Sequence, residues 1–249
     1  MNKNYYAPPL LLIVTFMCSM ASFASQDRNP ADPYEGFNRV VFKFNDTLDH
    51  FVVKPVAKTY RWVAPKFVER GVSNFFSNLG EVTTVPNHLL QGKFGQGFKS
   101  TGRFLINSTI GVAGLWDVAS PMGLEKTKED FGQTLGKWNV PSGPYLVLPI
   151  LGPSTVRDAG GLVVDTLTKP TTWIVDDASA QVSLTVVQGI DKRAALLDSE
   201  SMLTGDKYSA IRDFYLQIRE YNVRDGVVED DFVNDNSDGS EEEFLDESF

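Results

Sequence analysis

The stretch DPYEGFNRVVFKFND, Asp32 to Asp46, predicts how this chain folds because it combines a helix start with a helical pattern. Asp32 can cap a helix, Pro33 suits the first helical position, and Glu35 follows three residues after Asp32, as in a capping box. Apolar residues then recur at spacings of three and four, the period of an amphipathic helix: Phe37, Val40, Val41, Phe44, Leu48 and Phe51. We therefore expect a helix from Asp32 with one apolar face.

The same helical period returns along the chain, whereas the alternation typical of strands does not. One helix is expected between Pro55 and Pro65, and another ends near Gly80, before a turn at Pro86. Further helices are expected at Phe98 to Leu105, from a cap at Ser154 or Thr155 to Pro170, at Val182 to Leu197 and at Tyr208 to Tyr221. The sequence thus predicts a single, mostly α-helical domain.

The two ends of the chain differ from this helical part. Lys3, an apolar run and the small-x-small group ending at Ala24 are typical of a signal peptide. We predict a signal peptide at 1–24, a linker at 25–31 and the folded domain at 32–224. Residues 225–249 contain eleven acidic and no basic residues, which predicts an acidic, disordered tail.

Cys18 is the single cysteine, so no internal disulfide is possible. It could carry a lipid, as in a lipoprotein. The residues before it, Phe16 and Met17, are bulky where a lipoprotein signal has small residues. Cleavage after Ala24 would remove Cys18 instead, and the sequence leaves both alternatives open.

Several function classes are not expected. Without the tail, 21 acidic residues face 23 basic ones, and no basic face suggests nucleic-acid binding. His50, at the end of the first helix, and His88, in the turn after Pro86, are the only imidazoles, and no nucleophile motif accompanies them. Spaced Cys/His clusters are also missing from the sequence. We therefore expect no catalytic residues, no metal site and no cofactor.

Five blocks of the sequence resemble the MlaA/VacJ family of outer-membrane proteins that bind phospholipids. The resemblance extends from about Asp32 to Arg224. The blocks are DPYEGFNRVVFKFND (Asp32 to Asp46), VSNFFSNLGE (Val72 to Glu81), RFLINSTIGVAGLWD (Arg103 to Asp117), DFGQTLGKWNVPSGPYLVLPILGPSTVRDAGG (Asp130 to Gly161) and RAALLDSES (Arg193 to Ser201).

This resemblance implies a helical, ring-like body, half-inserted in the periplasmic leaflet of the outer membrane of a Gram-negative bacterium, with an amphipathic channel at its centre. Phospholipids misplaced in the outer leaflet would pass through the channel to a soluble periplasmic carrier of the Mla type, which maintains lipid asymmetry. The resemblance also implies a porin trimer as a neighbour and a lipid on the N-terminal cysteine. It implies no enzymatic activity.

The segment GPYLVLPILGPSTVRD, Gly143 to Asp158, is apolar but rich in prolines that would interrupt a helix or a central strand. One interpretation is that it borders the lipid channel and contacts acyl chains. The other is that it is a packed loop that closes the helical core. The channel candidates here and on the first helix are Tyr145, Leu146, Leu148, Ile150, Leu151 and Phe37.

Four polar residues lie next to these apolar blocks. They are Asn38 and Arg39 near the start of the first helix, and Arg157 and Asp158 near the start of a later one, where Thr155 and Asp158 have capping-box spacing. Each could guide the phosphate or amine of a lipid headgroup. Each could equally be a helix cap or part of a surface ion pair.

The main hypothesis is therefore a non-enzymatic phospholipid transport protein. A porin-associated structural protein without transport activity is one alternative. A periplasmic hydrolase with an unrecognised site is another, although the sequence offers it no nucleophile motif.

Overall fold

A computed structural model describes residues 29–202 and 205–227 of the chain. The predicted signal peptide, Cys18 and most of the predicted linker and tail lie outside the described residues and stay predictions. The elements are α2 (Glu35–Leu48), the π-helical turn η2 (Asp49–Val53), α3 (Lys54–Val63), α4 (Lys66–Leu90), α5 (Phe94–Thr109), the 3₁₀ turn η3 (Ser120–Met122), α6 (Phe131–Lys137), β1 (Tyr145–Leu148), β2 (Gly152–Thr155), α7 (Val156–Thr168), α8 (Pro170–Ile174), α9 (Ala178–Ala195), the 3₁₀ turn η4 (Ser199–Met202) and α10 (Lys207–Val223). Helices dominate, which confirms the prediction of a mostly α-helical domain.

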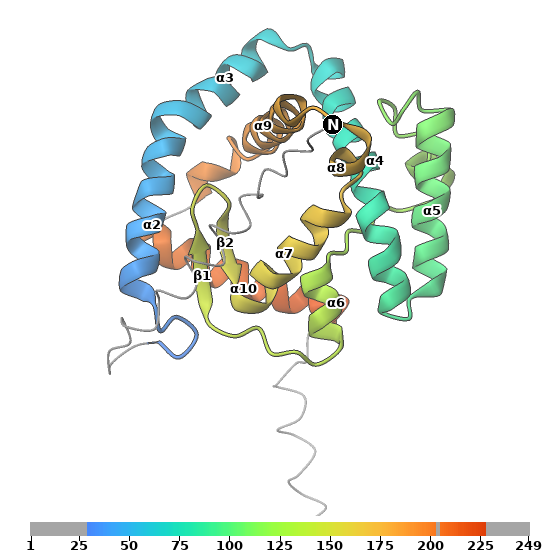
Figure 1. The fold of residues 1–249 in the computed structure, drawn as a ribbon. Helices are drawn as coiled ribbons and strands as arrows, with labels where there is room; N and C mark the ends of the chain where they lie inside the picture. The colour runs from blue at the N-terminus through green and yellow to red at the C-terminus, as the bar shows by residue number, and fades with distance from the viewer. Residues whose placement is uncertain (1–28, 203–204, 228–249) are drawn as a thin grey trace, which may run out of the picture.

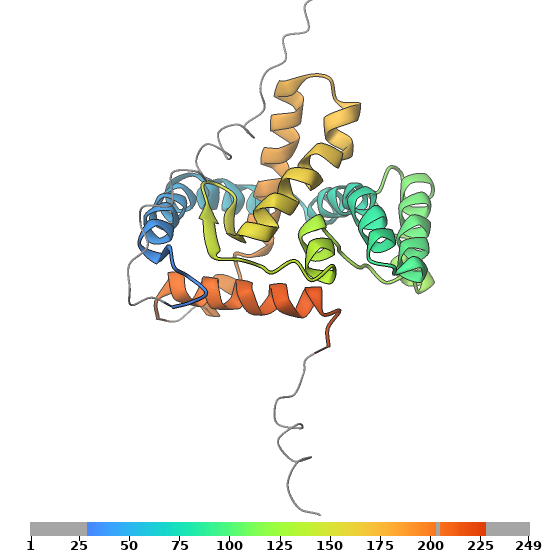
Figure 2. The same ribbon diagram turned by 60° about the horizontal axis from the view of Figure 1, so that its bottom comes forward.

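The helices are arranged as a ring around a small hairpin (Figure 1). α2, η2 and α3 form a bent arch, α4 continues it, and α5 packs along α4. The hairpin and α7 lie inside the arch, while α6 and α10 lie across its open end. Seen from the side, α2 to α5 form one layer, with α10 on one side and α7, α8 and α9 projecting from the other (Figure 2).

The bend of the arch has a local cause. The chain stays helical from α2 through α3, but η2 is a wider π turn, in which the Lys54 N–H donates to the Asp49 carbonyl. Pro55 follows directly, and a proline removes one hydrogen bond from the helical ladder and crowds the preceding turn. π turns and prolines are the usual sites at which helices bend.

The first helix begins later than its sequence predicts. Tyr34 is the N-cap residue of α2 and makes no side-chain cap bond, so the prediction of an Asp32 capping box was wrong. The Asp32 carboxylate is fully buried and accepts hydrogen bonds from Asn38 Nδ2 (2.8 Å), Tyr208 Oη (2.5 Å) and Arg212 Nη1 (3.3 Å). A buried carboxylate needs several donors, which α2 and α10 supply together. Asp32 therefore fastens the chain start to two helices.

The predicted end near Gly80 and turn at Pro86 were also wrong, because α4 continues through both residues to Leu90. Beyond Gly80, Glu81, Thr84 and His88 form a buried stripe at helical spacing. This stripe faces α5 and the segment that leads to α6, and its contacts hold the helix together despite the missing N–H of Pro86. His88 is thus a fully buried helical residue and not a turn residue.

The proline-rich segment forms a β-hairpin, which the sequence pattern did not predict. β1 and β2 are antiparallel, with Val147 opposite Pro153 and Leu148 opposite Gly152. The Val147 N–H points away from β2, because it donates to Asn38. In an antiparallel pair, the residue opposite Val147 also directs its backbone nitrogen away from the partner strand. Pro153 therefore occupies a position at which the pairing of β1 and β2 needs no N–H. Pro149 lies in the turn.

The interior of the ring is unusually polar. Within the described residues, buried polar and charged side chains outnumber buried apolar ones. The apolar cluster that does exist joins α2, β1 and α10: Val41, Tyr145, Val147 and Tyr208, with Phe37, Phe42, Tyr215 and Leu216 against it. Most large apolar side chains are therefore found elsewhere, on the outside.

Candidate functional site

The predicted apolar stripe of α2 and η2 is divided between the core and the surface. Val41 packs in the core, but Val40, Phe44 and Phe51 expose 69%, 55% and 73% of their surface. Asn38 of the same helix is fully buried. α2 therefore exposes large apolar side chains while it buries a polar one, which is unusual for a helix at the surface of a water-soluble domain.

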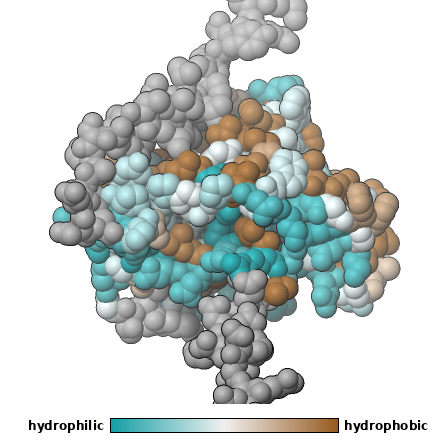
Figure 3. Space-filling model, turned by 90° about the horizontal axis from the view of Figure 1, so that it is seen from below, coloured by the Kyte–Doolittle hydropathy of each residue, from teal (hydrophilic) through white to brown (hydrophobic). Residues whose placement is uncertain are grey.

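This outward apolar surface continues around the layer of α2 to α5. We name it the apolar belt, defined by exposed side chains of α2 to α5 and of the segment after α5: Val40, Phe44, Phe51, Val52, Trp62, Phe67, Val68, Leu89, Leu90, Phe94, Phe98, Leu105, Ile110, Val112, Leu115 and Trp116. Figure 3 shows hydrophobic residues along the rim over α5, while hydrophilic residues cover much of the face that carries α10. Extended exposed apolar surfaces mark binding sites for membranes or for other proteins.

The hairpin is fixed to α2 by two asparagines that act in place of a third strand. Asn38 Nδ2 donates to the Tyr145 carbonyl (3.0 Å), and Asn38 Oδ1 accepts from the Val147 N–H (2.9 Å). Asn45 repeats the pattern with the Leu148 carbonyl (2.9 Å) and the Ile150 N–H (2.7 Å). The two side chains thereby pair four backbone groups along the outer edge of β1 and the turn, and unpaired groups there would be costly in an apolar environment.

The tip of the hairpin is apolar, exposed and strained. Ile150 and Leu151 expose 74% and 57% of their surface. Ile150 has a φ of 67°, a left-handed conformation that β-branched residues rarely adopt. The Asn45 side chain holds it in place through the Ile150 N–H. Such strain persists only where the surroundings enforce it, and it is concentrated at functional sites.

The structure separates the apolar channel candidates into two groups. Tyr145, Leu146 and Leu148 are buried on the hairpin, and Phe37 packs partly buried against the same core. Ile150 and Leu151 are the ones that reach the surface. A role in lipid binding stays a prediction for both groups.

The polar candidates on α2 take part in internal contacts. Asn38 binds β1 and Asp32, as described above. Arg39 pairs with Glu35 (2.7 Å) and Asp206 (2.7 Å), and its guanidinium lies 4.3 Å from the centre of the Tyr208 ring. Arg39 thus links α2 to the start of α10 and leaves about two fifths of its side chain exposed.

Asp158 lies at the centre of a buried ion-pair network. Thr155 caps α7 by accepting from the Asp158 N–H, as the spacing predicts, and this frees the carboxylate for other partners. It pairs with Arg157 (3.1 Å) and Arg219 (2.8 Å). Burial acts to raise the pKa of Asp158, but the Arg219 guanidinium and the other donors outweigh it, so the pKa lies below its usual value.

Arg219 extends this network from α10 to α6. It pairs with Asp130 at 2.5 Å as well as with Asp158. The helices α6 and α7 meet closely at Gly132 and Gly161, where a Cβ on Gly161 would lie 2.4 Å from the Gly132 nitrogen. Gly132 and Gly161 thus allow the two helices to cross in close contact.

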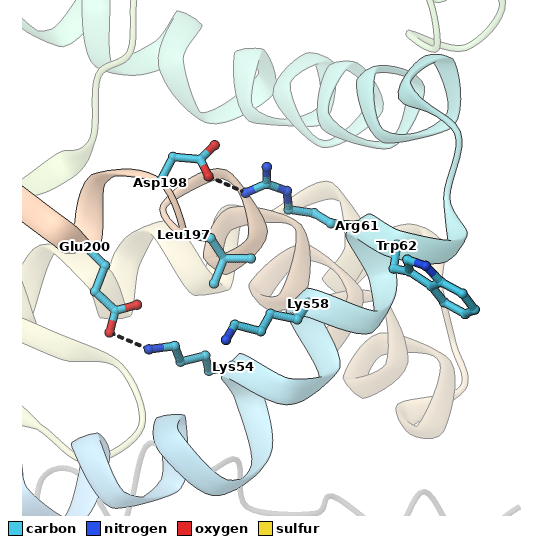
Figure 4. A pocket seen from close by; sticks show the side chains of 7 residues that line it. All are labelled: Lys54, Lys58, Arg61, Trp62, Leu197, Asp198 and Glu200. Atoms are coloured by element: carbon cyan, nitrogen blue, oxygen red, sulfur yellow. Dashed lines mark hydrogen bonds and ion pairs between the residues drawn. The ribbon is translucent and has the colours of Figure 1, made fainter.

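A cavity of about 710 Å³ lies between α3 and the segment that leads to η4. Figure 4 shows Lys54, Lys58 and Arg61 projecting from α3 toward Leu197, Asp198 and Glu200, while Trp62 turns to the other side. The sequence patterns did not predict this site. The sequence does show Lys54, Lys58 and Arg61 at helical spacing. It does not show that Asp198 and Glu200, more than 130 residues later, lie opposite them.

The described residues contain no helix long and apolar enough to cross a membrane. The same residues include no group of three or more His, Cys, Asp or Glu side chains that could hold a metal ion. Burial lowers the pKa of His88, and its Nε2 pairs with Thr127 Oγ1 at 2.8 Å. His50 stacks edge-on against Phe51 in η2.

Comparison with known proteins places the chain in a family, since a family model for the MlaA lipoprotein matches residues 30–222. The chain belongs to the MlaA lipoprotein family. The intermembrane phospholipid transport system lipoprotein MlaA of Escherichia coli (strain K12) is 36% identical over 225 residues, which cover 88% of this chain and 89% of that protein. The protein of the same name from Haemophilus influenzae is 32% identical over 232 residues, which cover 91% and 93%.

A solved structure of the MlaA family supports the same fold. It is described as the structural basis for maintenance of bacterial outer membrane lipid asymmetry. It superimposes with a TM-score of 0.70 at 38% identity and covers 79% of this chain and 100% of that one. The MlaA family is a lipid-transport family and not a family of enzymes. The resemblance read from five sequence blocks is therefore confirmed.

Proposed function

We propose that this chain is a phospholipid transport protein of the outer membrane of a Gram-negative bacterium and has no enzymatic activity. It removes phospholipids misplaced in the outer leaflet through an amphipathic passage inside the ring and delivers them to a soluble periplasmic carrier of the Mla type. The membrane then keeps its lipid asymmetry. The names of the E. coli and H. influenzae relatives support this assignment.

The observation that carries the proposal is the apolar belt. Its side chains are exposed along one layer of helices, α2 to α5 (Figure 2), while Asn38, Glu81 and Arg103 of the same helices are buried. Amphipathic helices with this arrangement lie in the plane of a membrane, with their apolar faces among the acyl chains of one leaflet. In the proposal, the ring sits half-inserted in the periplasmic leaflet.

The passage inside the ring is part of the proposal. Irregular backbone at membrane depth is tolerated where it packs in protein or lines a polar cavity. The hairpin meets this condition, because Asn38 and Asn45 satisfy the outer edge of β1. We assign acyl-chain contact to its tip, Ile150 and Leu151. The buried residues Tyr145, Leu146 and Leu148 support the tip from within.

The proposed partners follow from the same assignment. Phospholipid is the cargo, a soluble carrier of the Mla type is the acceptor, and a porin trimer is the neighbour in the membrane. The polar face with α10, opposite the side from which α7, α8 and α9 project, is the face we assign to the carrier.

Reconstitution tests the function directly. The purified chain is placed in vesicles that contain labelled phospholipid, and a soluble acceptor is added. We expect label to move intact to the acceptor. Cleaved label would indicate a hydrolase, and the absence of both transfer and cleavage would indicate a structural protein.

A matched pair of variants ties transfer to the tip of the hairpin. Replacing Ile150 with Asp places a charge at the proposed acyl contact, and we expect transfer to fall by roughly 10-fold or more. The control is Lys43→Asp, which changes a charge at an exposed position of α2 outside the hairpin. Equal transfer by both variants would contradict the role assigned to the tip.

A further inference from the structure

We propose that the cavity between α3 and η4 binds the phosphate group of a phospholipid, with Lys58 as its principal cation. This inference rests on the proposed function and adds a defined headgroup site to it. The site lies outside all the residues that the sequence suggested for headgroup contact, namely Asn38, Arg39, Arg157 and Asp158.

The first support is the geometry of α3. Lys54, Lys58 and Arg61 stand at positions i, i+4 and i+7, so they share one face of the helix. All three line the same cavity of about 710 Å³ and project into it (Figure 4). Lysine and arginine side chains are the usual protein partners of phosphate oxygens.

The second support is the charge balance of the cavity. Lys54 pairs with Glu200 at 2.8 Å, and Arg61 pairs with Asp198 at 2.9 Å. Lys58 forms no ion pair with any described residue, so the lining carries one excess positive charge. An anion that enters therefore finds a lysine that is not already neutralised.

Lys54 and Arg61 are already paired with carboxylates, so they shape the cavity and do not compete with Lys58 for the anion. Glu200 is held by Lys54 and also by Arg193, at 3.0 Å, and these two cations lower its pKa to about 2. The carboxylate thus stays ionised and fixes Lys54 beside Lys58. Arg61 is anchored in the same way by Asp198 on the opposite side of the cavity.

The surroundings favour a lipid over a free anion. Trp62 and Leu197 give the cavity apolar parts, and Trp62 is largely exposed at its edge, as is typical of tryptophans at a membrane interface. A second, mainly apolar groove of about 500 Å³ runs along another side of α3 and contains Val56, Val63 and Val187. One helix thus offers both a cationic site and an apolar groove.

The experiment compares lipids that differ in the phosphate group. Vesicles doped with phosphatidylglycerol or with diacylglycerol of the same acyl chains are incubated with the full chain, and native mass spectrometry counts the lipid bound after gentle extraction. We expect phosphatidylglycerol to be retained far better than diacylglycerol. Lys58→Gln is expected to lower phosphatidylglycerol retention by roughly 5-fold, while Lys58→Arg preserves it.

The controls separate this inference from the proposed function. Lys43→Gln removes an exposed lysine on α2 and should retain lipid like the wild type. If Lys58→Gln also behaves like the wild type while transfer persists, the headgroup site is refuted and the function stands. If the wild type retains neither lipid, the proposed function itself fails.

Competition with inorganic phosphate shows whether the cavity binds the phosphate of a lipid or free phosphate. A large excess of it should displace little phosphatidylglycerol from the wild type, because free phosphate lacks the acyl chains that add to the binding of the lipid. If inorganic phosphate binds in a Lys58-dependent manner and phosphatidylglycerol does not, the cavity is a site for free phosphate and the proposal is wrong. Thermal unfolding of each variant checks that the fold is retained.

Discussion

The two sides of α2 and the turn η2 that follows it differ in polarity. One side presents Val40, Phe44 and Phe51 to the surroundings, while the other places Asn38 and Asn45 of α2 against the backbone of a hairpin. In a water-soluble domain the apolar side would face inward, because burial of apolar surface drives folding. The comparison suggests that the surroundings of the ring supply the apolar contacts, so hydrogen bonds and ion pairs can hold its interior together.

The same contrast is repeated on a smaller scale in the hairpin. Leu148 and Ile150 are only two residues apart, but Leu148 exposes 5% of its surface and Ile150 exposes 74%. Similar residues therefore have different roles according to the side of the ring that they face. Each prediction below changes one side and leaves the other intact.

The largest expected effect comes from a charge on the buried side of the hairpin. Leu148→Asp should destabilise the fold by about 4–5 kcal/mol, because an unpaired carboxylate would be buried beside α2. Ile150→Asp, at the exposed tip, should change stability by only about 0.5 kcal/mol. Chemical denaturation in detergent measures both values. Equal losses would mean that the tip is part of the packed core.

The next effect concerns the ion-pair network between α6, α7 and α10. Arg219→Ala leaves Asp130 and Asp158 without their main cation, and removal of one partner from a buried pair costs about 3–5 kcal/mol. Arg70→Ala, at an exposed position on α4, is the matched control and should cost less than about 0.5 kcal/mol. A small loss for Arg219→Ala would contradict a polar interior that holds the ring together.

A smaller effect is expected where α2 meets β1. Asn38→Ala leaves the Val147 N–H, the Tyr145 carbonyl and one Asp32 contact unsatisfied, at a cost of about 2–3 kcal/mol. Hydrogen exchange provides the local readout. The Val147 amide should lose protection in this variant, while the Leu146 amide, which faces β2, should lose less. Unchanged exchange at Val147 would show that Asn38 is dispensable.

The smallest effect is a pH dependence. Burial, helped by the nearby Asp130 charge, raises the pKa of Asp165 to about 6 in the folded chain, from an ordinary value of 3.8. The folded state therefore favours the protonated form, and the stability from this group is present at low pH and is lost as pH rises from about 4 to 6. Asp165→Asn should remove this slope and increase stability near pH 7 by about 1–2 kcal/mol. A steeper slope in the variant would contradict the assignment.

The sequence predicted the helices better than their orientation. The periodic pattern located α2, α3, α7, α9 and α10, and the capping-box spacing located the start of α7 at Thr155. A period of 3.6 residues shows that a helix has an apolar side, but it does not show whether that side meets a protein core or a lipid. The pattern therefore did not show that Phe44 and Phe51 are exposed.

The remaining errors came from contacts between distant segments. The sequence predicts Asp32 as a helix cap, but its carboxylate accepts hydrogen bonds from Tyr208 and Arg212 of α10, which are distant in sequence. Pro86 predicts a turn, but the contacts of Glu81 and His88 with other segments keep α4 helical. The cavity at Lys58 was missed for the same reason, since Asp198 and Glu200 reach it from a different helix.

The central claim is that the apolar belt lies in hydrocarbon while the face with α10 lies in water. Spin labels test it most directly, attached to a single cysteine in a Cys18→Ser background at Phe44, Phe98 or Glu220, in vesicles. Oxygen concentrates in the acyl region and charged nickel chelates stay in water. The account predicts that labels at Phe44 and Phe98 are relaxed by oxygen and not by nickel, and that the label at Glu220 shows the reverse. Equal access of nickel to all three positions would contradict it.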